Sequence, residues 1–251
     1  ERVHNRMVTH QAGIYSLEMP ESTNKLRVRW QHGPVGEAVN ATPGETLTLK
    51  APAVARISLE AKEFGTDQSI PARVILQNEL GKETLQVIGP QGPTNRLVVP
   101  GQYAILFTRG HEYEASFHEE INAEDGQTIS IVGELQRVID TSGWIACDFH
   151  LHSDFSTDSA DPLRQRILEV AAEGVEFAVS TDHDFVVDYA PLRDSQGLAP
   201  FLQVTQGVEM SNPKLNHASS FPWDVKPLQS GQGAPSWHTL VPHDLFTLLG
   251  M

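Results

Sequence analysis

Basic residues and cysteine are both scarce in this chain of 251 residues. Lys and Arg number 18 against 32 Asp and Glu, which gives a formal net charge of −14. Binding to nucleic acid or to an anionic membrane surface depends on clustered Lys and Arg, so neither partner is expected. Cys147 is the only cysteine, and a disulfide within the chain is therefore excluded.

Long apolar runs and several catalytic motifs are absent as well. No apolar run approaches the roughly 20 residues that a transmembrane helix needs, so membrane insertion is not expected. The sequence contains no Gly-x-Ser-x-Gly nucleophile motif and no Gly-rich phosphate loop, which disfavours serine-type acyl transfer and nucleotide chemistry. The apolar fraction of 39% and the charged fraction of 20% are typical of a globular protein with a packed core.

The first 143 residues have the pattern of β-structure. Short alternating or apolar segments recur between clusters of Gly, Pro, Asn and Asp, as at residues 89–93 and 122–126. Short strands with frequent turns predict an antiparallel β-sandwich. We place the end of a preceding β region at residues 1–50 and a sandwich domain at residues 51–143. The expected strands are 25–30, 46–50, 55–61, 72–77, 84–88, 96–99, 103–107, 113–117 and 128–132.

The pattern changes at Trp144, where a strand–helix–strand alternation begins. Asp161 and Pro162 predict a helix start, because Asp is a favoured N-cap and Pro a favoured first helical residue. Apolar residues then recur at helical spacing, and Gly174 ends the helix. This order predicts a βαβ unit with a parallel sheet. The other expected elements are strands at 145–148, 175–180 and 201–205 and a helix from 242 to 249.

Each expected strand of this second half ends in side chains that can bind metal ions. His150 and His152 follow the first strand at i, i+2 spacing, which places both imidazoles on one face. His183 follows the second strand and Glu209 the third. Imidazole and carboxylate are common ligands of transition metals, and the carboxyl ends of parallel strands meet at one edge. Two loop residues, Asp158 and His217, complete the candidate ligand set.

A structural explanation of the same residues is the alternative. The His150–His152 pair alone is a weak metal signal, and residues 181–184 have the composition of a turn. Three strands that each end in His or a carboxylate favour a metal site over a purely structural role. Polar groups of this kind in a protein core need partners, and a metal ion would be one. The remaining histidines form no such pattern and are expected at the surface: His4, His10, His32, His111, His118, His238 and His243.

At these residues the sequence resembles the PHP (polymerase and histidinol phosphatase) superfamily, and within it the carbaryl-hydrolase-like metalloesterases. The motifs that carry the resemblance are residues 148–153, Asp158, 180–184, 207–209 and 215–217. Residues 97–103 resemble the closing strands of transthyretin-like or carboxypeptidase-regulatory-like sandwiches. The resemblance implies a multidomain fold in which the antiparallel sandwich precedes an α/β domain, the first half of a distorted (β/α)7 barrel, at residues 144–251.

The resemblance also implies a multinuclear metal centre with two or three Zn, Mn or Fe ions. Its expected ligands are His150, His152, Asp158, His183, Glu209 and His217. Glu209, Asp158 and His183 are then also the expected catalytic residues, and Asp148 and Asp182 would orient ligating imidazoles. The implied activity is hydrolysis of a small-molecule ester or phosphoester by a metal-activated water.

Residues 144–251 are too few to close a barrel of this kind. We therefore expect the chain to be an excerpt that lacks the later ligands, with the C-terminal part of the same barrel as its partner. The alternative function is a non-catalytic β-sandwich binding or adhesion module with a degenerate PHP appendage. A periplasmic or secreted bacterial location is expected for either function.

Overall fold

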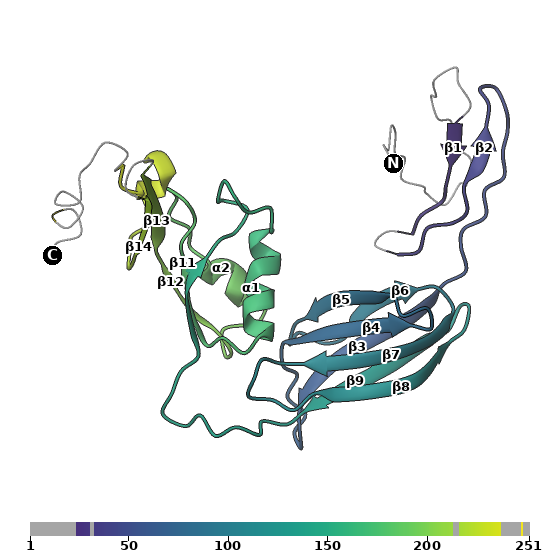
Figure 1. Ribbon diagram of the computed structural model, residues 1–251, viewed down its shortest axis with the longest axis horizontal. Helices are drawn as coiled ribbons and strands as arrows, with labels where there is room; N and C mark the ends of the chain where they lie inside the picture. The colour runs from purple at the N-terminus through teal and green to yellow at the C-terminus, as the bar shows by residue number, and fades with distance from the viewer. Residues whose placement is uncertain (1–23, 31–32, 213–215, 237–246, 248–251) are drawn as a thin grey trace.

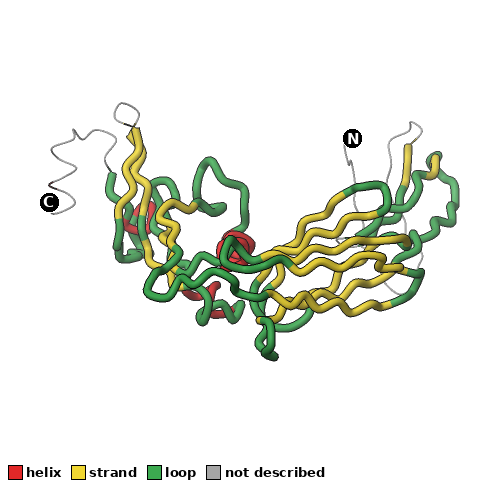
Figure 2. Tube along the Cα trace, turned by 60° about the horizontal axis from the view of Figure 1, so that its bottom comes forward, coloured by secondary structure: helices red, strands yellow, loops and turns green. Residues whose placement is uncertain are grey.

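The computed structural model describes residues 24–30, 33–212, 216–236 and 247. Most regular structure in these ranges is β, with two α-helices (Figure 1). A β-sandwich and a smaller α/β unit lie side by side, and a short hairpin of β1 (Asn24–Leu26) and β2 (Val39–Ala41) lies beyond the sandwich. Figure 2 shows the strands of the sandwich running toward a helix at the junction of the two units.

The sandwich consists of two sheets with the strand orders β6-β3-β9 and β5-β4-β7-β8. Within the first sheet β3 pairs with β6 antiparallel and with β9 parallel. The expectation of a purely antiparallel sandwich is therefore wrong for one pair of strands. The bounds are β3 (Ala55–Glu63), β4 (Ala72–Asn78), β5 (Glu83–Ile88), β6 (Thr94–Val98), β7 (Gly101–Thr108), β8 (Ser116–Ala123) and β9 (Thr128–Leu135).

Alternation of apolar and polar residues along these strands builds the core between the two sheets. Ile57 and Leu59 on β3 and Val74 on β4 are fully buried, whereas their neighbours in sequence are more exposed. Phe107 of β7 crosses to β9 at Gly133, where a Cβ atom would collide with the phenyl ring. The close approach of the two sheets at this point therefore requires glycine. Residues 46–50, expected as a strand, are irregular.

The α/β unit contains a three-stranded parallel sheet of order β10-β11-β12. Leu163, Ile167 and Val170 of α1 are buried against it at helical spacing. The helix begins one residue later than expected: Pro162 is the N-cap, and Asp154 rather than Asp161 accepts from the Leu163 N–H at 3.0 Å. The bounds are β10 (Cys147–Leu151), α1 (Leu163–Ala172), β11 (Phe177–Ser180), α2 (Ala190–Ser195) and β12 (Gln203–Gln206).

The expected first half of a (β/α)7 barrel is wrong. After β12 the chain passes through Gly207 directly into β13 (Val208–Asn212), which pairs antiparallel with β14 (Asn216–Ser220). No helix separates β12 from β13, and an isolated bridge between His183 and Glu209 joins the hairpin to β11. The strand–helix alternation that a barrel needs thus stops after three strands, and the described ranges form no closed barrel.

A 3₁₀ turn, η1 (Ser230–Gly233), is the last regular element before residue 237. The helix expected at residues 242–249 lies outside the described residues except for position 247, and so do His238 and His243. In the described ranges no helix is both long and apolar enough to cross a membrane.

A buried arginine joins the sandwich to the α/β unit. Arg109 follows β7, is 4% exposed, and donates through Nη1 to the carbonyl oxygens of Pro71 at 2.7 Å and Ala171 at 2.6 Å. Arg73 of β4 forms an ion pair with Glu173 at the end of α1. These contacts pack the C-terminal end of α1 against the sandwich.

Gly133→Ala tests the packing between the sheets. We expect a loss of about 1–3 kcal/mol in the free energy of unfolding, because the new methyl group must displace Phe107 in a closely packed core. The neighbouring Val132 is partly exposed, so Val132→Ala as a control should cost less than about 1 kcal/mol. Urea unfolding measures both, and an equal effect of the two substitutions would contradict the packing argument.

Candidate metal centre

Four separate segments deliver histidines and carboxylates to one edge of the parallel sheet. His150 lies on β10 and His152 directly after it, where the β10–β11 register shifts. His183 follows β11, whereas Glu209 and His217 lie on the two strands of the β13–β14 hairpin. The structure thus brings the six expected ligand residues, including Asp158 from the loop after β10, into one cluster.

Glu209 lies at the centre of the cluster with its side chain 5% exposed. Its Oε2 is 2.8 Å from His150 Nε2 and 2.7 Å from His152 Nε2, and its Oε1 is 3.1 Å from His217 Nδ1. Burial raises the pKa of this carboxyl group, but the hydrogen bond from His150 and the charges of the nearby histidines lower it further. The net shift is below the ordinary value, so the carboxylate is ionised.

Asp158 is the second carboxylate of the cluster. Its Oδ1 is 3.0 Å from His152 Nδ1 and accepts from Ser156 Oγ at 2.7 Å, and its Oδ2 is 3.5 Å from His183 Nε2. The hydrogen bonds from Ser156 and His152 lower the pKa of Asp158 to about 2. The cluster therefore contains two ionised carboxylates at neutral pH.

The nitrogen atoms of the imidazoles converge more closely than side-chain packing requires. His150 Nε2 and His152 Nε2 are 3.1 Å apart, although a pair of imidazole nitrogens can share only one hydrogen. Ligand atoms of a tetrahedral zinc, at about 2.0–2.1 Å from the ion, lie about 3.3 Å from one another. The cluster contains three overlapping groups whose ligand atoms lie within 4.8 Å: His150–His152–Glu209, His152–Asp158–His183 and His183–Glu209–His217.

The expectation that Asp148 and Asp182 orient imidazole rings differs from the observed contacts. Asp148 Oδ1 accepts from the backbone N–H of His150 at 2.9 Å. Asp182, whose pKa is raised by burial, accepts from Ser153 N at 2.6 Å, Ser153 Oγ at 2.9 Å and the Tyr189 hydroxyl at 3.0 Å. Both carboxylates therefore fix the backbone that carries the histidines rather than the rings.

Ser211 is a residue of the cluster that sequence reasoning missed. Its Oγ lies 2.8 Å from His183 Nδ1, which leaves His183 Nε2 directed at the carboxylates. A strand over residues 208–212 would have placed Ser211 on the same face as Glu209, two residues earlier. Ser211 was missed because the sequence analysis did not predict the strand on which it lies.

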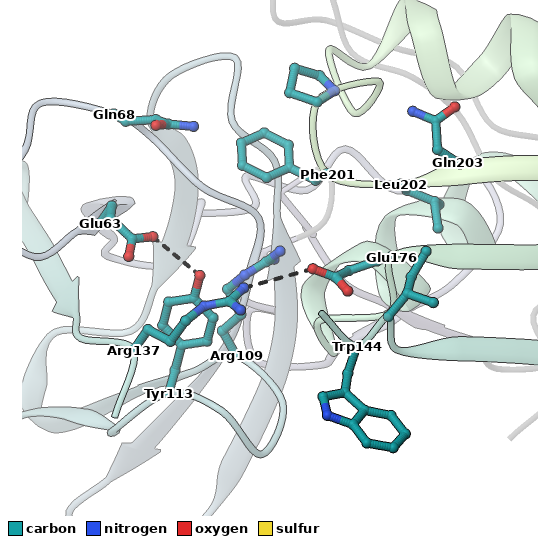
Figure 3. Close-up of a pocket in the computed structure, with 12 residues that line it drawn as sticks. Glu63, Gln68, Arg109, Tyr113, Arg137, Trp144, Glu176, Phe201, Leu202 and Gln203 are labelled. Carbon is teal, nitrogen blue, oxygen red and sulfur yellow. Dashed lines mark hydrogen bonds and ion pairs between the residues drawn. The ribbon is translucent and has the colours of Figure 1, made fainter. Parts of the chain in front are cut away.

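The cluster is open to solvent on one side. The side chains of His150 and His217 are 58% and 50% exposed. A cavity of about 450 Å³ does occur in the described structure, but it lies between the sandwich and the α/β unit and none of its lining residues belongs to the cluster (Figure 3). The cleft and the cluster are therefore two separate places in the described structure.

Comparison with known proteins finds no protein-family model and no curated protein that matches the chain. Three similar solved structures are a putative carbohydrate binding protein from Bacteroides uniformis, the Bacillus anthracis TIE protein and the minor pilin GBS52 of Streptococcus agalactiae. Their sequences are 12%, 18% and 11% identical to the chain, with TM-scores of 0.29, 0.30 and 0.29. The matches cover 34%, 47% and 41% of this chain and 42%, 25% and 54% of those chains.

The expected membership of the PHP superfamily is corrected by the fold. The described ranges contain two α-helices and no closed barrel. The expected hydrolase activity is corrected with it, whereas the expected catalytic roles of Glu209, Asp158 and His183 stay predictions. The short distances among the six side chains remain a property of the structure in their own right.

Asp182→Ala tests the turn that positions the histidines. The change leaves two donors of Ser153 and the hydroxyl of Tyr189 without their acceptor, and each buried donor left unpaired costs roughly 1–3 kcal/mol. We expect a loss of about 3 kcal/mol in the free energy of unfolding, measured by urea titration. The exposed Asp224 provides the control, since Asp224→Ala should change stability by less than about 0.5 kcal/mol.

Proposed function

We propose that the chain is a non-catalytic β-sandwich module that carries a divalent metal-binding unit. The sandwich domain would span residues 51–143 and the metal-binding unit residues 144–251, with residues 1–50 as the end of a preceding β region. The observation that carries the proposal is the convergence of four imidazoles and Asp158 around the buried carboxylate of Glu209. A periplasmic or secreted location and a small-molecule ligand for the module belong to the same proposal.

The chemistry of the donor set supports a transition metal. Imidazole suits Zn and Fe, and the two carboxylates also suit Mn, whereas Mg and Ca prefer sites made of oxygen ligands alone. His152 and His183 each keep one nitrogen in contact with a neighbouring Asp or Ser side chain, and metal-binding histidines are commonly oriented in this way. We propose His150, His152, Asp158, His183, Glu209 and His217 as the ligands.

Sharing of residues among the three groups supports more than one ion. Glu209 belongs to two of the groups, and so do His152 and His183. A carboxylate has two oxygen atoms and can bridge two ions, whereas one imidazole nitrogen binds a single ion. We therefore propose two or three ions at saturation, with Glu209 as the bridging ligand.

A structural role fits the position of the ligands along the chain. They come from β10, the loop after it, the end of β11 and the β13–β14 hairpin. Ions bound here would cross-link the hairpin to the parallel sheet, to which an isolated bridge attaches it. Because metal binding to a folded site adds to the free energy of folding, the ions would stabilise this unit.

Metal content tests the proposed site. After chelation and reloading with Zn or Mn, elemental analysis of the purified protein should give at least one ion per chain, because six side chains that can bind metal converge there. The double substitution His150→Ala and His152→Ala should lower that number by at least one, since it removes members of two of the three groups. His111→Ala is the matched control, because His111 is exposed in the sandwich and belongs to no ligand group.

The metal content would contradict the proposal if it stayed below one ion per chain and was unchanged by the double substitution. Thermal unfolding provides an independent measurement. A metal at about 100 times its dissociation constant should add about 2.7 kcal/mol of stability, and the double variant should lose this gain.

The non-catalytic part of the proposal has its own test. The metal-loaded protein should hydrolyse p-nitrophenyl phosphate, bis-p-nitrophenyl phosphate and 1-naphthyl acetate no faster than the His150→Ala, His152→Ala variant, because the proposed ions cross-link the hairpin to the sheet and activate no water. Initial rates with equal metal in solution provide the comparison. Hydrolysis that follows the bound metal and disappears in the variant would refute a purely structural role.

A further inference from the structure

The cleft between the sandwich and the α/β unit is a second place where a ligand could bind. Its volume is about 450 Å³, within the range of about 300–1,000 Å³ typical of small-molecule sites. Both units contribute to its walls, with Glu63, Gln68 and Tyr113 on the sandwich side and Phe201, Leu202 and Gln203 on the other (Figure 3).

The charges in this cleft are balanced. Tyr113 donates through its hydroxyl to Glu63 Oε2 at 3.2 Å, and Arg137 Nη2 lies 3.8 Å from Glu176 Oε1. Arg109 adds a second guanidinium group, so two cations face two carboxylates among the lining residues. An anion would meet the two carboxylates and a cation the two guanidinium groups, so a neutral ligand fits best.

One buried donor in the cleft has no acceptor. Arg109 uses Nη1 for the carbonyl oxygens of Pro71 and Ala171, but its Nε–H makes no hydrogen bond to any described residue. The Nε atom is shielded from solvent, so Arg109 contributes charge to the wall of the cleft rather than a hydrogen bond to a ligand.

The aromatic residues of the cleft differ in whether a guanidinium group lies near the ring. The guanidinium groups of Arg109 and Arg137 lie 5.5 Å and 5.2 Å from the centre of the Tyr113 ring, and Arg109 also lies 5.5 Å from that of Phe201. Trp144 lies at the edge of the cleft and is 83% exposed (Figure 3). Its indole is therefore available to a ligand that has an apolar C–H face.

We propose that this cleft binds a neutral saccharide. A pyranose ring has a C–H face for Trp144 and hydroxyl hydrogens for the carboxylates of Glu63 and Glu176. Gln68 and Gln203 provide side-chain amides that can both donate and accept. The proposal is independent of the proposed metal ligands, because no residue of the cleft is a member of the cluster.

Saturation-transfer NMR with four sugars tests the proposal: glucose, galactose, mannose and N-acetylglucosamine. At about 10 mM, which exceeds a millimolar dissociation constant about tenfold, at least one sugar should show transfer from the protein. Trp144→Ala should weaken that sugar at least about tenfold, since it removes the exposed ring. Phe117→Ala is the matched control: Phe117 is an exposed aromatic residue outside the cleft, and its loss should leave binding unchanged.

Further measurements distinguish a saccharide site in the cleft from binding at the metal cluster and from an anion site. Binding should persist after chelation and in the His150→Ala, His152→Ala variant, and the bound sugar should shift the indole N–H resonance of Trp144. The proposal is overturned if none of the four sugars shows transfer, or if Trp144→Ala and Phe117→Ala weaken binding equally. Inorganic phosphate that binds the cleft in place of every sugar would identify an anion site and refute a neutral ligand.

Discussion

The rest of the α/β unit depends on one buried carboxylate surrounded by four imidazoles. An ionised group that is nearly removed from water needs opposite charge or several donors, and Glu209 obtains them from histidines of three other segments. The β13–β14 hairpin must therefore lie close to β11. Gly207 permits this approach, because a Cβ atom there would lie 2.8 Å from the carbonyl oxygen of Ser180.

Hydrogen bonds among the surrounding turns hold this arrangement. Thr181 Oγ1 accepts from the Leu151 N–H at 2.9 Å, and Asp182 binds Ser153, so the turns after β10 and β11 are joined directly. Asp184 has a positive φ of 52°, which Asp tolerates better than most residues, and its Oδ1 accepts from Ser211 N at 3.0 Å. The backbone that carries the histidines is thus positioned by contacts that involve no ion, which favours selective binding.

The sequence predicted local features well and distant pairing poorly. Alternation located most strands of the sandwich, and strand ends located four of the six clustered residues, because both patterns depend on neighbours in sequence. The parallel partnership of β3 with β9 joins segments some 70 residues apart, and no local pattern records it. The motifs that resemble the PHP superfamily lie at strand ends and depend only on neighbouring residues. Closure of a barrel depends on pairing between its first and last strands, which these motifs do not specify. The β13–β14 hairpin was missed for the same reason, and Ser211 with it.

Helix α1 contacts both the cluster and the sandwich. Near its start, Arg166 donates through Nε to the His152 carbonyl oxygen at 2.9 Å, and near its end the Ala171 carbonyl accepts from Arg109. A change that unfolds α1 would therefore damage the cluster and the cleft together. A shared helix alone does not couple two sites, because coupling needs two conformations that the ligands favour differently. The proposed metal and saccharide sites would therefore share the support of α1 without being coupled through it.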